Sequence, residues 1–263
     1  MRWPGVTGWA ATSALSRRLI GCLLGAIASI AVALLLPGLF PEGAGFVQLC
    51  VLLALQEILL IGLPALLVML RSPASSRALK GLWGRPTAYQ SGLAMLAAVS
   101  FTLVSVLITV LFLSLLQSFG VPPPEGQFLV PETAEQLLMA SLSATFIPAI
   151  AEELLFRGLV QGGIAARLSP AAGLWASALL FALLHRSLLA FPQMLAIGLV
   201  LGRLKQRSGS LMLPIIFHAV YNFAVLVLNF SRAVPSLGMM LLCIAAFTVS
   251  YRLLMKEDKL VES

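Results

Sequence analysis

The sequence predicts an all-α, polytopic membrane protein with about eight transmembrane helices, folded as a single transmembrane domain over residues 1–263. Hydrophobic residues make up 60% of the chain and charged residues only 10%, against roughly 25% charged residues in soluble domains. The mean hydropathy is +1.01. The long apolar runs do not alternate as the strands of a membrane barrel do, so each run is expected to be a helix.

Eight apolar segments follow one another, and several are separated by connections rich in proline and glycine, such as Pro37 to Gly45 and Gly120 to Pro131. The fourth segment is longer than a bilayer requires and is expected to protrude, and the sixth is short for a full crossing. In chain order the segments are 19–40, 46–70, 91–116, 134–167, 171–190, 192–206, 211–230 and 234–254.

The first three segments carry few features that indicate chemistry. The first ends at Pro37-Gly38 without a small-residue cleavage pattern, so we expect a retained helix and not a signal peptide. In the second, Glu57 lies mid-span beside Gln56. A structural use is the main expectation for Glu57, and a partner for Arg157 or a supporting position behind a site is the alternative.

The basic residues predict the orientation. With these segments as crossings, 15 of the 17 Lys and Arg residues (17 − 2), Arg157 among them, fall on one side, and Arg186 and Arg232 fall on the other. The positive-inside rule then places both termini in the cytoplasm, and the plasma membrane is the expected location. The basic residues lie in loops and not along one helix face, so nucleic acid is not an expected partner. The expected partners are membrane lipid and a peptide or protein substrate, which can itself carry a lipid.

The fourth segment contains three ionisable residues in an apolar setting. Glu153 and Arg157 are spaced i,i+4 on one helix face, where their charges can neutralise each other. Glu152 lies about 100° further around the helix, so it is left to act as a general base. The alternative is a purely structural salt bridge, although two carboxylates and one arginine leave an acid over. Ionisable side chains at membrane depth are rare and mark functional sites.

The chain has two histidines, and both lie in apolar segments. His185 follows Phe181 by one helical turn in the fifth segment, and His218 precedes Asn222 by one turn in the seventh. His and Asn on one face could stabilise an oxyanion, and the alternative is a polar contact between helices. By helical rise Glu153 and His185 each lie about 21 Å from the cytoplasmic ends of their helices, and His218 about 10 Å.

These three pairs of residues resemble the three motifs of the CAAX protease and bacteriocin-processing family (CPBP or Abi), which includes the type II CAAX prenyl endopeptidase. The motifs read Glu152-Glu153-x-x-x-Arg157, Phe181-x-x-x-His185 and His218-x-x-x-Asn222. The resemblance covers about residues 145–230, inside a predicted catalytic core of helices over residues 134–230.

The resemblance implies an intramembrane endopeptidase. In that family's pattern, Glu152 and His185 would activate the water that attacks the scissile carbonyl. His218 and Asn222 would hold the oxyanion, and the ion pair of the fourth segment would organise the site. The site is expected to open from the cytoplasm or laterally from the lipid. Prenylated peptides, leader peptides and bacteriocin precursors are all compatible substrates.

A metal ion is an open question at this stage, because family members have been described both as metalloproteases and as glutamate-dependent enzymes. Glu152, His185 and His218 could bind zinc with water in the fourth position. The sequence has no His-Glu-x-x-His, which excludes the commonest zinc protease motif. Asn222 is a poor zinc ligand, which favours a site without metal.

Two functions outside proteolysis also fit the sequence. A non-catalytic membrane scaffold or bacteriocin-immunity partner would keep the polar residues for helix association. A proton transporter would use the Glu and His residues as a relay.

Overall fold

The structure, a computed structural model, describes residues 45–70, 83–122 and 129–256, and all regular elements in these ranges are helical. Two long helical runs are built from several consecutive pieces that include π-helical turns. In chain order the elements are α2 (Phe46–Gln56), η2 (Glu57–Gly62), α3 (Leu63–Leu70), α5 (Ala88–Ser118), α6 (Ala134–Ser141), η3 (Leu142–Phe146), α7 (Ile147–Glu152), η4 (Glu153–Gln161), α8 (Gly162–Ala165), α9 (Pro170–Leu184), α10 (Phe191–Ser208), α11 (Met212–Ser231) and α12 (Leu237–Lys256).

Within the described ranges, five helices are long and apolar enough to cross a membrane, namely Phe46–Leu70, Ala88–Ser118, Ala134–Ala165, Met212–Ser231 and Leu237–Lys256. This confirms the predicted all-helical membrane fold. Helix α9 is a shorter apolar helix, and α10 carries three basic residues in its last turns. The predicted segment 19–40 lies outside the described residues. The count of eight crossings therefore stays a prediction.

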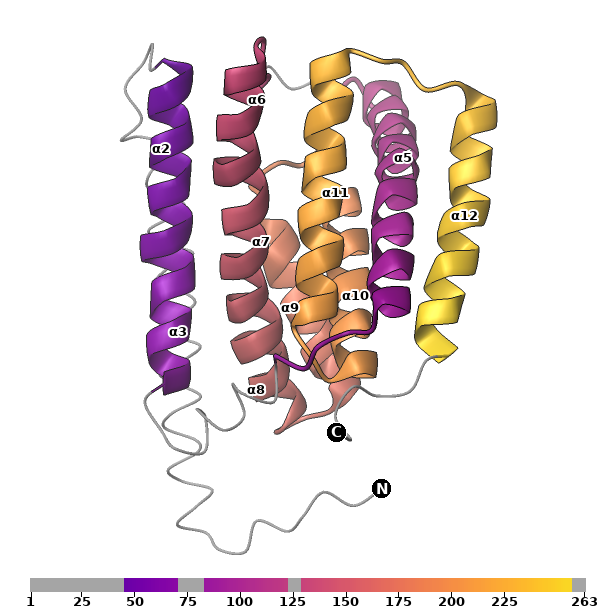
Figure 1. The fold of residues 1–263 in the computed structure, drawn as a ribbon. Helices are drawn as coiled ribbons and strands as arrows, with labels where there is room; N and C mark the ends of the chain where they lie inside the picture. The colour runs from indigo at the N-terminus through magenta and orange to yellow at the C-terminus, as the bar shows by residue number, and fades with distance from the viewer. Residues whose placement is uncertain (1–44, 71–82, 123–128, 257–263) are drawn as a thin grey trace, which may run out of the picture.

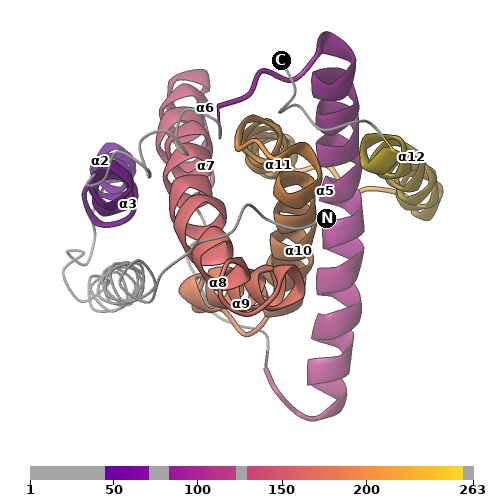
Figure 2. The same ribbon diagram turned by 90° about the horizontal axis from the view of Figure 1, so that it is seen from below.

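The helices form a bundle around α10 and α11, which lie at its centre (Figures 1 and 2). The run from α6 to α8 lies on one side of this centre and α5 on the other. Outside these two, the α2–α3 run packs near α7 and α12 packs along α5. Helices α9 and α10 pack against each other as an antiparallel hairpin.

The α9–α10 hairpin is short compared with the helices around it. Its helices have 15 and 18 residues, or about 22 and 27 Å of rise, whereas the 31 residues of α5 rise about 46 Å. Its turn, residues 185–190, therefore lies partway along the bundle (Figure 1). This geometry leaves unfilled space beyond the turn.

The predicted segment 171–190 is wrong at its end, because α9 stops at Leu184 and His185 follows as the C-cap. The next residue, Arg186, has a φ of 52°, which ends the helix. The Nδ1 of His185 also bonds the carbonyl of Phe181 at 2.9 Å, in place of a further helical amide. The apolar pattern cannot reveal this end, since residues 185–191 contain neither glycine nor proline.

The long predicted fourth segment is confirmed as a continuous helical run from Ala134 to Ala165. It contains two π-helical stretches, and the second begins at Glu153. The α2–α3 run has a similar stretch that begins at Glu57. A π turn inside an α-helix often marks a functional site, and here two of the three π stretches begin at a buried carboxylate.

Glycines allow close contacts both between the two helices of the short hairpin and between the hairpin and the η4–α8 run. A Cβ added at Gly198 of α10 would lie 3.1 Å from the Cα of Ala178 in α9. A Cβ added at Gly173 of α9 would lie 2.5 Å from the backbone oxygen of Gln161 and 2.9 Å from the Cβ of Ala165. Small residues at such contacts bring membrane helices together by van der Waals packing.

We therefore expect Gly173→Ala to destabilise the protein by about 1–3 kcal/mol, the usual cost of inserting atoms into a packed contact. Thermal unfolding in detergent measures the effect. The matched control is Gly92→Ala in α5, where nothing lies within 4 Å of the added methyl group and alanine favours the helix by about 1 kcal/mol. Equal unfolding temperatures for the two variants would contradict this account of the packing.

Candidate active site

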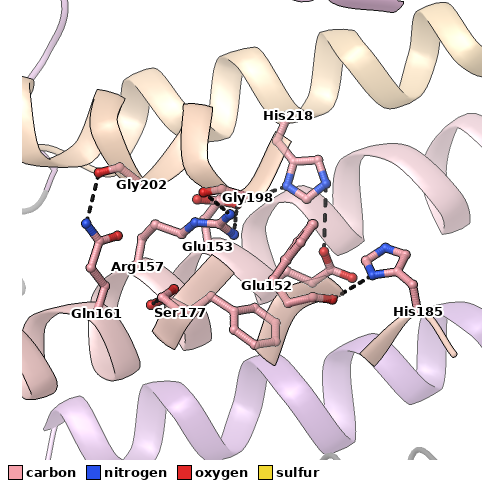
Figure 3. A network of polar contacts seen from close by, with 11 residues as sticks. Glu152, Glu153, Arg157, Gln161, Ser177, His185, Gly198, Gly202 and His218 are labelled. Carbon is pink, nitrogen blue, oxygen red and sulfur yellow. Dashed lines mark hydrogen bonds and ion pairs between the residues drawn. The ribbon is translucent and has the colours of Figure 1, made fainter. Parts of the chain in front are cut away.

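A buried ion pair lies at the centre of the bundle. Arg157 and Glu153 both have fully buried side chains, and the Nη1 of Arg157 donates to the Oε1 of Glu153 at 2.7 Å. The Nη2 of Arg157 donates to the carbonyl of Gly198 in α10 at 3.2 Å. The guanidinium carbon lies 4.5 Å from the centre of the Phe181 ring in α9, a favourable cation–π distance. The predicted i,i+4 pair is thus present, and it joins three helices (Figure 3).

His218 of α11 lies between the two carboxylates of the fourth segment (Figure 3). Its Nδ1 is 3.0 Å from the Oε1 of Glu153, and its Nε2 is 3.7 Å from the Oε2 of Glu152. An ionised carboxylate can only accept a hydrogen bond, so the Nδ1 of His218 carries the proton that it donates to Glu153. The other nitrogen faces Glu152.

His185 is oriented by the end of its own helix. Its Nδ1 lies 2.9 Å from the carbonyl oxygen of Phe181, and a carbonyl only accepts, so Nδ1 is the protonated nitrogen. In the neutral ring Nε2 is then an acceptor. The ring centroid lies 4.8 Å from that of Phe181. Phe181 also contacts the ring of His218 edge-on at 5.7 Å, so one aromatic ring supports both histidines and Arg157.

A cavity of about 570 Å³ brings the three motifs together. Glu152 from α7, His185 from the end of α9 and Asn222 from α11 all line it. Glu153, Arg157 and His218 are not among its lining residues and are buried behind it. Glu152 and His185, both labelled in Figure 3, thus border the same space. The six predicted residues therefore divide into three that face the cavity and three that support them.

The structure changes two expectations for the polar residues. Glu57 is not a partner of Arg157 within the described chain; it lines the cavity with Glu152, and its Oε2 is buried without a hydrogen-bond partner there. His218 was expected nearer the cytoplasmic end of its helix than Glu153, yet the two side chains are in contact. Counting the residues from each helix end overlooks the different starting depths of the helices.

Sequence reasoning missed further polar residues in the cavity wall. The hydroxyl of Thr109 in α5 donates to the Oε1 of Gln193 in α10 at 2.8 Å. The hydroxyl of Tyr221 in α11 donates to the Oγ of Ser105 in α5 at 3.2 Å. All four residues line the cavity. In the sequence these residues are visible as single polar side chains in apolar runs. The sequence does not show how deep in the bundle they lie.

Two more buried hydrogen bonds fix the helix that carries the carboxylates. The Nε2 of Gln161 donates to the carbonyl of Gly202 at 2.9 Å, which repeats one turn later the contact between Arg157 and Gly198. The Oγ of Ser177 in α9 donates to the carbonyl of Phe156 at 2.9 Å. These bonds hold η4 to both helices of the hairpin.

Metal binding by Glu152, His185 and His218 stays a prediction. In the described part of the chain, no group of three His, Cys, Asp or Glu side chains is arranged to hold a metal ion. The Nδ1 atoms of both histidines are bonded, to Glu153 and to Phe181, as is also usual in histidines that bind a metal through Nε2. The chemistry below uses no metal.

Comparison with known proteins identifies one family. Residues 134–224 match the family model described as "Type II CAAX prenyl endopeptidase Rce1-like". The match runs from the start of α6 into α11 and includes all three motifs. Searches of curated proteins and of solved structures gave no match.

We expect Arg157→Ala to destabilise the protein by about 3–5 kcal/mol, because it leaves the Glu153 carboxylate buried without its partner. Thermal unfolding in detergent provides the measurement. Arg203→Ala is the matched control, since Arg203 is exposed near the end of α10. The double variant Glu153→Gln/Arg157→Met removes both charges and should recover part of the loss. Equal losses for Arg157→Ala and Arg203→Ala would show that the ion pair does not stabilise the fold.

Proposed function

Because the match over residues 134–224 places this chain in the CAAX protease family, we propose that it is a membrane-embedded endopeptidase that hydrolyses a peptide bond of a membrane-associated polypeptide. The observation that supports this most is the convergence of Glu152, His185 and Asn222, from three separate helices, on one cavity. The cavity is large enough for a peptide segment, since ligand pockets measure about 300–1,000 Å³.

The first step in this proposal is the activation of water. The Oε2 of Glu152 is buried without a hydrogen-bond partner within the described chain, and the Nε2 of His185 is an acceptor. A water molecule between them can donate one hydrogen to each, which turns a lone pair of its oxygen toward the scissile carbonyl. One of these bases takes a proton as the new carbon–oxygen bond forms.

Asn222 is suited to the next step. Its side-chain amide donates hydrogen bonds, and it lies on the wall of the same cavity. The amide can therefore stabilise the negative oxygen of the tetrahedral intermediate. The intermediate collapses by breaking the carbon–nitrogen bond. The proton taken from water passes to the leaving amine, and the products are a carboxylate and an amine.

We assign His218 a supporting role, in place of the oxyanion contact that the family resemblance suggested. His218 lies behind the cavity wall, with one nitrogen bonded to Glu153 and the other turned toward Glu152. From there it orients the Glu152 carboxylate and balances its charge as the proton moves. The Arg157–Glu153 pair in turn fixes the imidazole of His218.

We expect Glu152→Gln to lower proteolysis by at least 100-fold, the low end of what a general base contributes. The readout is the set of new protein N-termini that appears in membranes on expression of the wild type, which can be measured before any substrate is identified. Glu135→Gln, an exposed site at the start of α6, is the matched control. The same assay with a chelator tests the metal-dependent alternative. Equal N-termini from wild type and Glu152→Gln, at equal folded yield, would exclude the proposal.

Once a substrate is known, Asn222→Ala should lower kcat by about 100- to 1,000-fold with a much smaller change in KM, because an oxyanion contact forms mainly in the transition state. Asn229→Ala is the control: Asn229 also lines the cavity but lies two helical turns further along α11. A non-catalytic membrane partner would instead keep its biological effect in folded His185→Ala and Asn222→Ala variants.

A further inference from the structure

The two ends of the helix bundle differ in charge. At the first end, hydrogen bonds join the ends of several helices. Gln206 of α10 donates to the carbonyl of Pro170, and Arg207 donates to the carbonyl of Lys256. We call it the basic end, because the described residues there include seven Lys and Arg and no Asp or Glu. The seven are Arg85, Arg167, Arg203, Lys205, Arg207, Arg252 and Lys256.

The opposite end is where α5 finishes and α6 begins, and we call it the α5–α6 end (Figure 1). The described charged residues at the surface of this end are two acids, Glu132 and Glu135, and one base, Arg232. By the positive-inside rule, the basic end faces the cytoplasm and the α5–α6 end faces outward.

The cavity is confined to the half of the bundle toward the α5–α6 end. In α5 its lining residues span 105–110, and in α11 they span 221–229, next to the end of that helix at Ser231. Leu129, which precedes α6, also lines it. Its floor is the turn of the short α9–α10 hairpin, through Leu184, His185, Gln193 and Met194.

The other half of the bundle is closed by packing. Residues 88–104 of α5, 212–220 of α11 and 195–208 of α10 contribute nothing to the cavity. Below the floor lie fully buried side chains, including Phe156, Arg157 and Phe217. A peptide from the basic end would have to displace this core, whereas toward the α5–α6 end the cavity extends along α11 as far as Asn229.

We propose that the active-site cavity opens to the outer face of the membrane, so that the substrate is an already exported, membrane-anchored polypeptide cut within the outer half of the bilayer. This inference rests on the proposed function in one respect: it takes the molecule that enters the cavity to be a substrate. It differs from the sequence-based expectation of access from the cytoplasm or laterally from the lipid, which considered only the predicted depth of the motifs and not the position of the cavity.

The charge of the cavity supports the same substrate class. Its charged lining residues are Glu57 and Glu152, and no Lys or Arg of the described chain lines it. A short leaving peptide with a free C-terminal carboxylate, as from the tail of a cytoplasmic prenylated protein, would find no Lys or Arg of the described chain there to pair with its charge. An internal segment of an anchored chain brings no such carboxylate, and the amides of Gln56, Gln193 and Asn229 can bond its backbone.

Labelling with a membrane-impermeant maleimide tests the direction of access. Cys22, Cys50 and Cys243 are first replaced by serine, and single cysteines are then introduced as Asn229→Cys at the cavity mouth or Lys256→Cys at the basic end. Both positions are exposed. In spheroplasts we expect Asn229→Cys to react at least ten-fold faster than Lys256→Cys, and the difference to disappear when the membrane is opened. Faster reaction of Lys256→Cys in sealed spheroplasts would overturn the inference.

A second arm separates this inference from the proposed catalysis. One cleavable segment, taken from the N-termini that depend on the wild type, is placed on a single-span anchor either outside or inside the membrane. We expect the wild type to cut only the outer version and Glu152→Gln to cut neither, with unchanged maleimide labelling. Cleavage of only the inner version would overturn the inference. If the wild type cuts neither, the proposed catalysis fails and the labelling alone decides the access side.

Discussion

The structure depends on the need to neutralise charge inside an apolar bundle. Arg157 is fully buried, and its guanidinium is balanced by Glu153, capped by a carbonyl of α10 and covered by the ring of Phe181. An unpaired charge at this position would be costly in a low-dielectric interior. The contacts that reduce this cost come from different helices, so pairing the Arg157 guanidinium also fixes how η4, α9 and α10 pack.

The same contacts prepare the candidate site. Glu153 accepts hydrogen bonds from both Arg157 and His218, which turns the second nitrogen of His218 toward Glu152. The end of α9 leaves the carbonyl of Phe181 free to bond His185. Glu152 and His185, which face the cavity, are therefore each contacted by a residue that does not, an arrangement that keeps reactive groups in place without help from the substrate.

Because the α9–α10 hairpin is short, a cavity lies next to this buried network. If α9 and α10 continued to the α5–α6 end, their side chains would fill the space that Glu152, His185 and Asn222 share. Because they stop midway, a cavity lies beyond them, while the opposite half of the bundle remains packed. Our proposal that this cavity faces the outer side of the membrane rests on the distribution of Lys and Arg.

The sequence by itself determined the helical class, the positions of most helices and the polar residues that the bundle brings together, since membrane length and the rarity of buried charge leave few alternatives. The i,i+4 pair of Glu153 and Arg157 also followed from helical spacing alone. Only the tertiary structure decided that α9 ends at Leu184, that His218 contacts both carboxylates, that Glu57 faces the cavity and which residues line that cavity. These features depend on the relative depth and rotation of helices, which are set by close contacts such as Gly198 against Ala178 and leave no periodic trace in the chain.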